Sequence, residues 1–113
     1  MNFKNIKCLS IKNDCIDISG ARIIGEKIYV ESAFDKGISI GENSDVEIKD
    51  INLSKNKIGV AVKDGSIVNL KNLDLRENTY DIALFNKKNE FKKPKLIVKK
   101  FKDLNEKKIL QSK

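Results

Sequence analysis

Apolar residues recur along the chain in columns that are 22 or 23 residues apart. Two columns repeat with spacings of 22, 23, 22 and 23: Ile6, Ile28, Ile51, Leu73 and Leu96, and Cys8, Val30, Leu53, Leu75 and Val98. Two others repeat at a constant 22: Ile16, Ile38, Val60 and Ile82, and Ile18, Ile40, Val62 and Leu84. A fixed period of this length indicates a repeat architecture in which each unit stacks on the next.

Within each repeat, apolar residues alternate with polar or small ones, which predicts strands. Residues 35–56 align without gaps on residues 57–78, and Gly, Asn, Asp and Ser separate the alternating segments. Each repeat holds three segments. The first are Cys15–Ser19, Gly37–Gly41, Gly59–Lys63 and Asp81–Phe85, the second are Asp45–Lys49 and Ile67–Lys71, and the third are Ile6–Leu9, Ile28–Glu31, Ile51–Ser54, Leu73–Arg76 and Leu96–Lys99.

Three strands in each coil predict an all-β fold, a right-handed parallel β-helix of about four coils over residues 1–100. No coil buries its own apolar face, so neighbouring coils stack around a shared core. A left-handed β-helix would require coils of about 18 residues built from six-residue units, and the apolar columns do not show this spacing. Asn56 and Asn78 occupy equivalent turns, which predicts an asparagine ladder from coil to coil.

The two ends of the predicted helix differ. Residues 101–113 form a basic C-terminal tail, in which residues 103–111 predict a short capping helix with Phe101, Leu104 and Ile109 or Leu110 covering the last coil. The N-terminus has no equivalent, because Ile6 already lies in a column. Open strand edges template pairing with other chains. We therefore expect further upstream coils, or a second copy of the chain, to cover the N-terminal edge.

Charge is concentrated at one end of the chain. Of the net +7, residues 1–85 contribute 12 basic against 13 acidic side chains, and residues 86–113 contribute 11 lysines against three acidic residues. Dense basic segments attract anionic polymers, although a solvated tail is the simpler interpretation. Aromatic residues do not interleave with the lysines, so no nucleic-acid partner is predicted. The absence of histidine excludes histidine-dependent triads and histidine metal sites.

Neither membrane spans nor secretion signals are indicated. The chain has no apolar run long enough for a spanning helix, and its N-terminus lacks an apolar signal segment, so the default location is cytoplasmic. Cys8 falls in an inward column, whereas Cys15 is predicted to face outward beside Asp14. We therefore expect no disulfide between them.

Residues 13–19, 35–44 and 58–66 resemble the right-handed parallel β-helix repeat proteins of the pectate-lyase-like superfold. The likeness extends over about residues 6–100. Because this superfold includes lyases, hydrolases, epimerases, phage tailspikes and adhesins, the resemblance specifies a fold rather than an activity. It implies a polysaccharide as the ligand class. No cofactor or metal site is predicted from the residues themselves, and calcium is implied only by the resemblance to the lyases.

The outer face of the first strands is the predicted binding strip. Its central column is made of small residues after Asp17, with Glu42 above Asp64 at its end and Lys36 and Asp14 at its start. A smooth strip edged by charges suits an extended sugar chain, so the predicted binding residues are Asp17, Lys36, Ser39, Glu42, Lys63 and Asp64. The structural alternative is that small residues make room for a covering segment and that the charges form ordinary ion pairs.

By resemblance, catalytic roles fall on the same residues. Asp17, Glu42 and Asp64 would be the acids, and Lys63 or Lys36 the base or substrate clamp. Three functions follow from the sequence. The first is a β-helix module without complete catalytic machinery, the C-terminal part or a short relative of a polysaccharide-binding or polysaccharide-processing protein. The second is a fragment of a lyase-like or hydrolase-like enzyme, and the third is a self-assembling solenoid.

Overall fold

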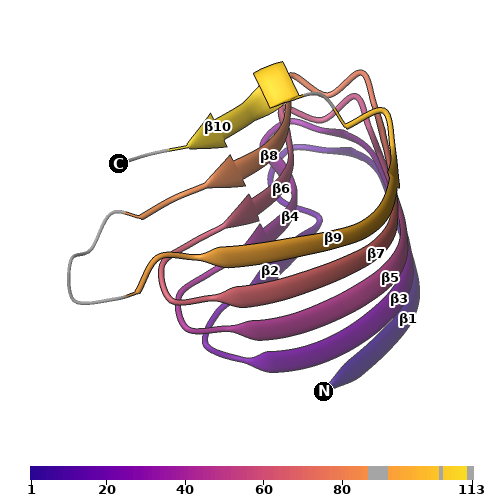
Figure 1. The fold of residues 1–113 in the computed structure, drawn as a ribbon. Coiled ribbons are helices and arrows are strands. Elements are labelled where there is room, and N and C mark those ends of the chain that lie inside the picture. The colour runs from indigo at the N-terminus through magenta and orange to yellow at the C-terminus, as the bar shows by residue number, and fades with distance from the viewer. Residues whose placement is uncertain (87–91, 105, 112–113) are drawn as a thin grey trace.

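The computed structural model describes residues 1–86, 92–104 and 106–111, and it is a parallel β-solenoid of about four turns (Figure 1). One sheet contains the long strands β1 (Asn2–Ile11), β3 (Arg22–Ala33), β5 (Asp45–Ser54), β7 (Ile67–Arg76) and β9 (Lys95–Lys102), in that order. The other contains the short strands β2 (Ile16–Ile18), β4 (Lys36–Ile40), β6 (Ile58–Val62), β8 (Tyr80–Leu84) and β10 (Ile109–Gln111). We call them the long-strand sheet and the short-strand sheet. The predicted parallel β-helix is confirmed.

Three corner columns turn the chain in each coil. Each long strand joins the predicted second and third segments and bends at a residue with φ of 58–59°, namely Asn5, Lys27, Asp50, Asn72 or Lys100. A second column of positive φ lies at the C-terminal ends of these strands, at Ser10, Ser32, Lys55, Glu77 and Asp103. The third column contains Gly20, Asn43 and Gly65. The coil is therefore three-sided, as predicted, although two of its sides form one continuous bent strand.

The corner at Lys27 gives a test of this geometry. Left-handed backbone costs a residue with a Cβ about 1 kcal/mol, whereas glycine adopts it freely. Lys27 is exposed and has a φ of 59°. We expect Lys27→Gly to raise the free energy of unfolding in urea by about 0.5–1 kcal/mol. The matched change Lys71→Gly, at an exposed strand position, should instead lower it by a similar amount. A loss of stability in both variants would contradict the proposed corner.

The aliphatic columns stack into one core. In the long-strand sheet Ile6 pairs with Ile28, Ile28 with Ile51, and Ile51 with Leu73, and the short-strand sheet aligns Ile16, Ile38, Val60 and Ile82 in the same way. Most of these side chains are buried in a single cluster. Because each inner coil places similar side chains above similar ones, the interior is continuous along the axis.

The last long strand departs from the predicted columns. Leu96 pairs with Val68 and Val98 pairs with Leu70, and Phe101 takes the place beside Leu73. The assignment of Leu96 and Val98 to the columns of Leu73 and Leu75 was therefore wrong. The connection from β8 to β9 is longer than the earlier connections, so the constant period ends with β8.

The asparagine ladder is confirmed. The backbone N–H of Ala33 donates to Asn56 Oδ1 at 2.8 Å, and the backbone N–H and Nδ2 of Asn56 both donate to Asn78 Oδ1 at 3.0 Å. Asn78 Nδ2 donates to the carbonyl of Leu53 at 3.0 Å. Both asparagines are 2% exposed. Since buried polar groups require partners, the ladder satisfies the turns of three successive coils.

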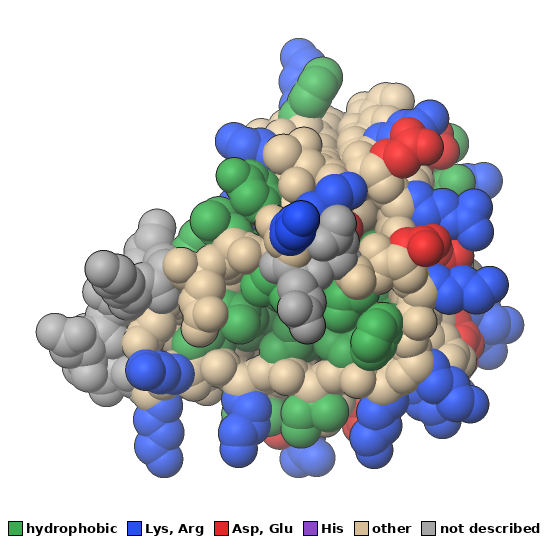
Figure 2. All heavy atoms as spheres, turned by 45° about the horizontal axis from the view of Figure 1, so that its top comes forward, with side chains coloured by type: hydrophobic (Ala, Val, Ile, Leu, Met, Phe, Trp, Pro, Cys, Tyr) green, Lys and Arg blue, Asp and Glu red, His purple; other side chains and the backbone are tan. Residues whose placement is uncertain are grey.

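The predicted capping helix is wrong. Within residues 106–111, one short 3-10 helix, η1 (Glu106–Lys108), leads into β10, which pairs with β8 by placing Ile109 beside Ile82. The C-terminal segment therefore begins another turn of the short-strand sheet instead of crossing the end. Leu104 packs against the core, whereas Phe101 is 54% exposed. Figure 2, with the C-terminal end turned forward, shows hydrophobic side chains near the centre of this end, and basic and acidic side chains along its right-hand margin.

The two cysteines of the chain lie close together at the first corner. Cys8 and Cys15 form a disulfide, with a Cα–Cα distance of 6.0 Å, so the prediction of none was wrong. The alternation of inward and outward side chains does not continue through a corner, and both cysteines pack against the core.

No helix in the described ranges has the length and apolar character needed to cross a bilayer.

Candidate functional site

The predicted strip on the short-strand sheet is enclosed in its central part. Its column has the predicted register, with Asp17 beside Ser39, Ser39 beside Ala61 and Ala61 beside Ala83. Asp17 is exposed, but Ser39 is 1% exposed and both alanines are 0% exposed. Tyr80, Phe85 and Leu110 pack against the cluster that contains the alanines. The small side chains therefore lie in a closed seam, so Ser39 offers no exposed surface to a ligand.

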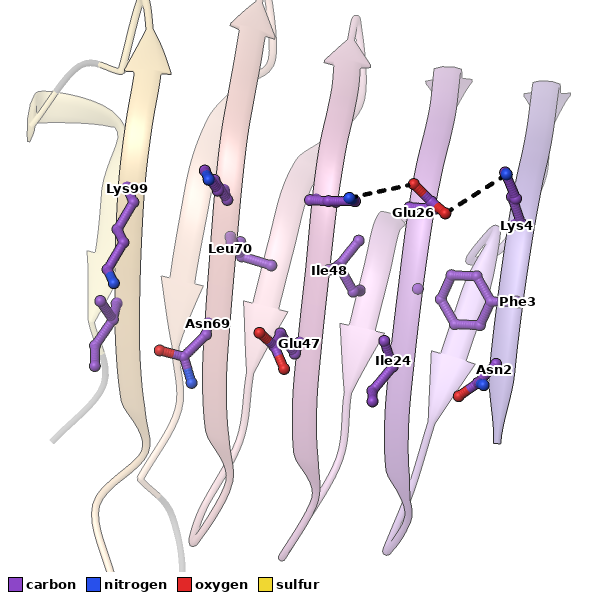
Figure 3. Close-up of a pocket in the computed structure, with 14 residues that line it drawn as sticks. Asn2, Phe3, Lys4, Ile24, Glu26, Glu47, Ile48, Asn69, Leu70 and Lys99 are labelled. Carbon is purple, nitrogen blue, oxygen red and sulfur yellow. Dashed lines mark ion pairs between the residues drawn. The ribbon is translucent and has the colours of Figure 1, made fainter.

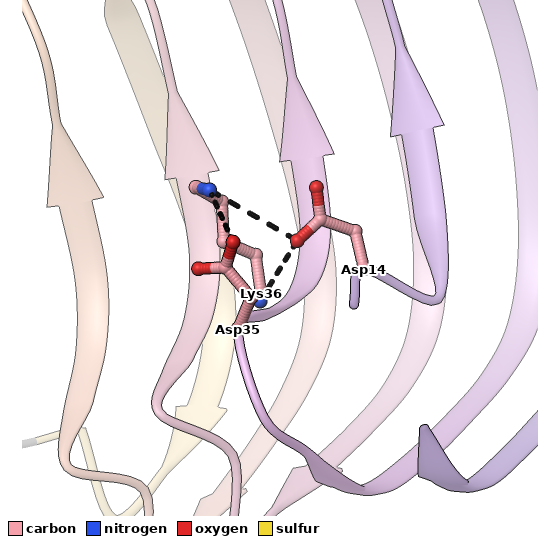
Figure 4. Close-up of polar contacts among 3 residues, drawn as sticks. All are labelled: Asp14, Asp35 and Lys36. Carbon is pink, nitrogen blue, oxygen red and sulfur yellow. Dashed lines mark hydrogen bonds and ion pairs between the residues drawn. The ribbon is translucent and has the colours of Figure 1, made fainter. Parts of the chain in front are cut away.

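Lys36 is held at the edge of this sheet by two carboxylates (Figure 4). Its Nζ lies 3.2 Å from Asp35 Oδ2 and 3.9 Å from Asp14 Oδ1, and its backbone N–H donates to Asp14 Oδ1 at 2.9 Å. The Lys36 side chain is 17% exposed and that of Asp14 is 18% exposed. These contacts join two adjacent coils, which gives Lys36 a structural role at this corner.

The remaining predicted residues lie where the short strands end. Glu42 and Lys63 are partly exposed, and Asp64 is 2% exposed. The backbone N–H of Asn43 donates to the carbonyl of Asp64 at 3.0 Å, so this corner of β4 stacks on the same corner of β6. The described residues contain no group of three or more histidine, cysteine or acidic side chains arranged to hold a metal ion. The roles suggested for Asp17, Glu42, Lys63 and Asp64 stay predictions.

A groove of about 760 Å³ crosses the strands of the long-strand sheet (Figure 3). Two columns of side chains line it. The first contains Asn2, Ile24, Glu47, Asn69 and Ile97, and the second contains Lys4, Glu26, Lys49, Lys71 and Lys99. Adjacent strands lie about 4.8 Å apart, so each column presents one side chain at about this interval along the solenoid axis. We call this feature the lysine groove.

Strand alternation explains why these columns share one face. Ile48 and Leu70 lie between the two columns and point into the core, where each is 1% exposed. Their neighbours on either side therefore point outward, and the groove passes over the backbone between them. Gly25 occupies the same inward column beside Phe3, and a Cβ there would lie 2.3 Å from the Phe3 ring. Glycine thus allows the aromatic ring to fill the end of the core.

Charge is unevenly distributed along the lysine groove. Glu26 lies 3.7 Å from Lys4 and 3.6 Å from Lys49, and these lysine side chains are 57% exposed. Such exposed pairs contribute little to stability. Lys71 and Lys99 form no ion pair with any residue that the structure describes. The described part of the lining holds four lysines and two glutamates, and its positive charge is least compensated toward β9.

The lysine groove was not predicted from the sequence, although four of its charged residues repeat every 22 or 23 residues. Lys4, Glu26, Lys49 and Lys71 follow the same spacing as the apolar columns and lie two positions before one of them. Following the outward positions of the predicted second strands would have found them. Lys99 could not be assigned in this way, because the long connection before β9 shifts its register.

A smaller groove of about 300 Å³ lies on the other half of the long-strand sheet. Some of its polar groups are paired within the groove. Arg76 Nη2 lies 3.3 Å from Asp74 Oδ2, and the Tyr29 hydroxyl donates to Glu31 Oε1 at 3.3 Å. Lys7 lies over the Tyr29 ring, 5.6 Å from its centroid. We therefore place the candidate site in the lysine groove.

Comparisons of the chain with protein-family models, curated proteins and solved structures found no match.

Proposed function

We propose that this chain is a non-catalytic β-solenoid module that binds an acidic polysaccharide in the lysine groove. The observation that supports this most directly is the register of Lys49, Lys71 and Lys99 on three adjacent strands. A ligand lying along the solenoid axis would meet one ammonium group on each of these strands. The sugar chain would therefore cross the strands rather than follow one of them.

The spacing of the lysines suits a polymer with repeated anionic groups. Three ammonium groups at intervals of about 4.8 Å provide a linear array comparable in scale to the sugar repeat of an extended polyuronate. Two exposed charges at about 4 Å interact by about 1 kcal/mol in water, so several weak contacts add up along a chain. Because the lysines belong to paired strands, binding requires little ordering of the backbone.

The other lining residues complement these charges. Asn2 and Asn69 offer amide donors and acceptors for sugar hydroxyl groups, and the exposed Ile24 and Ile97 offer apolar contacts for ring faces. Among the described residues that line the groove, Phe3 is the only aromatic one, and its ring lies against Gly25 at the end of the core. A groove without an exposed aromatic platform favours a polysaccharide over single-stranded nucleic acid, which binds largely by stacking its bases.

The arrangement of carboxylates favours binding without turnover. Glycoside hydrolysis generally uses a pair of carboxyl groups, one on each side of the scissile bond. The lysine groove has two glutamates, and Glu26 is engaged by two lysines. We therefore expect binding of the intact polymer with no release of shorter fragments.

Binding is tested by titrating the protein with polygalacturonate at low salt and measuring the heat of binding by calorimetry. We expect Lys71→Gln combined with Lys99→Gln to weaken binding about tenfold or more, because two uncompensated ammonium groups are lost. Added salt should weaken the wild-type interaction through screening. The matched control is Lys12→Gln combined with Lys57→Gln, which removes the same charge at exposed lysines outside the groove.

Three outcomes would contradict the proposal. Equal weakening in the two double variants would indicate attraction by net charge rather than by the lysine groove. Equal or tighter binding of a single-stranded oligodeoxynucleotide would contradict the assignment of a polysaccharide. Release of reducing ends from polygalacturonate would contradict the absence of turnover.

A further inference from the structure

The first coil of the solenoid has fewer backbone partners than the inner coils. Among the described strands, β1 pairs with β3 alone and β2 pairs with β4 alone. The inner strands β3 to β8 each pair on both sides. β2 is also short, with a register of three residues against β4. Backbone pairing alone therefore holds the first coil less firmly than its neighbours.

The Cys8–Cys15 disulfide links the two sheets within this coil. Cys8 lies on β1, and Cys15 immediately precedes β2. Cys8 pairs in register with Val30, and the backbone N–H of Cys15 donates to the carbonyl of Lys36 at 3.2 Å. The disulfide therefore closes the corner between the long-strand sheet and the short-strand sheet.

Inner coils close the same corner by packing. A Cβ at Gly37 would lie 3.2 Å from Leu53 Cδ2, and a Cβ at Gly59 would lie 3.4 Å from Leu75 Cδ2. A leucine of the following coil thus lies against each glycine. In the first coil a covalent bond occupies this corner. Both cysteine side chains are partly exposed, so a small reductant can reach them.

We propose that the Cys8–Cys15 disulfide is a redox-controlled clamp that keeps the first coil closed. A thiolate of a dithiol reductant attacks one sulfur, breaks the S–S bond and forms a mixed disulfide. The second thiolate of the reductant then forms its own intramolecular disulfide and releases the protein. The reductant loses two electrons, and Cys8 and Cys15 take up two protons to become thiols.

Opening this clamp affects the first coil selectively. β1 and β2 are then each held by one parallel partner, so they open more often than β5 to β8. The edges of β3 and β4 become accessible whenever the first coil opens. Since β1 also supplies Asn2 and Lys4, one end of the lysine groove is lost at the same time. Disulfides persist in oxidising compartments, where this clamp stays closed.

Hydrogen exchange of the full chain, with and without dithiothreitol, tests the clamp. Alkylation of two thiols verifies that the disulfide is reduced. We expect amides in residues 2–18 to exchange roughly tenfold or more faster after reduction, because the connection between Cys8 and Cys15, 7 residues apart in sequence, is then no longer closed by a covalent bond. Exchange in β5 to β8 should stay unchanged. Unaltered exchange in residues 2–18 of the reduced protein would overturn the proposal, and so would equal acceleration in every strand.

The control variant combines Cys8→Val with Cys15→Gly. These changes repeat Val30 and Gly37, the residues at the same positions of the next coil. We expect its exchange to be independent of dithiothreitol. Acceleration by the reductant in this variant would show that the effect does not come from the disulfide, which would also overturn the proposal. If the variant does not fold, the comparison of oxidised and reduced wild-type protein still decides the outcome.

Discussion

Replacing Asn78 with alanine is expected to lower the free energy of unfolding by about 3 kcal/mol or more. Asn78 Oδ1 accepts hydrogen bonds from the backbone N–H and from Nδ2 of Asn56, and its Nδ2 donates to the carbonyl of Leu53. The side chain is 2% exposed, so water does not replace these bonds. The variant would remove these partners from buried polar groups of Asn56 and Leu53 on the adjacent coil, and each unsatisfied group costs about 1–3 kcal/mol.

Urea denaturation of the two proteins measures this effect. Asn52→Ala is the matched control, because Asn52 is exposed on β5 and outside the ladder. We expect the control to change the stability by at most about 0.5 kcal/mol. Similar losses in both variants would mean that the ladder contributes no more than an ordinary surface amide.

Replacing Gly59 with alanine is expected to destabilise the fold by about 3 kcal/mol. The added Cβ would lie 2.6 Å from the carbonyl oxygen of Asp81, which belongs to the backbone of β8. A backbone atom cannot move aside as a flexible side chain can, so the β6–β8 pairing must shift. Leu75 Cδ2 lies 3.4 Å from the same position and limits movement toward the core.

Gly20→Ala separates close packing from the conformational freedom of glycine. Gly20 has a φ of 59°, and no neighbouring atom lies within 4 Å of the added Cβ. We therefore expect a loss of about 1 kcal/mol from backbone strain alone. Thermal unfolding of the two variants should show a clearly larger decrease for Gly59→Ala. An equal decrease would contradict the close approach of neighbouring coils at Gly59.

The inner coils were predictable because each coil has a similar coil on both sides. Matching side chains at Ile28, Ile51 and Leu73 stack directly, so the period alone predicts their register. Asn56 and Asn78 repeat at equivalent corners for the same reason, since the turn of each coil must satisfy its polar groups. Because the coils stack, residues that are one period apart in the sequence lie side by side in the structure.

The ends could not be predicted in this way. Cys15 was assigned outward by extending strand alternation through a corner, but it packs inward and pairs with Cys8. Leu96 was assigned by the period, but the longer connection before β9 changed its column. Residues 103–111 suggested a helix, yet β10 pairs in parallel with β8 and extends the short-strand sheet. The local pattern of apolar and polar residues predicts the structure least well at the ends of the solenoid, where a coil has a neighbour on one side only.

The candidate site was predicted less well than the fold. The sequence suggested an acidic and basic strip on the first strands, but Ser39 is buried, and Tyr80, Phe85 and Leu110 pack against the cluster that contains the alanines of the same column. Lys36 was found to be held by Asp14 and Asp35. In the lysine groove, Lys4, Lys49 and Lys71 follow the sequence period. Lys99 does not, because the register of β9 depends on the length of the connection that precedes it.

The lysines of the outermost strands also bear on fibre formation. If a second copy continued the solenoid in the same register, β9 of one molecule would lie beside β1 of the next. Lys99 would then face Lys4, and Lys102 would face Lys7. Like charges directly opposite each other destabilise strand pairing, and lysines on edge strands oppose aggregation. The electrostatic repulsion between the two ends therefore disfavours axial polymerisation, even though both ends present unpaired strands.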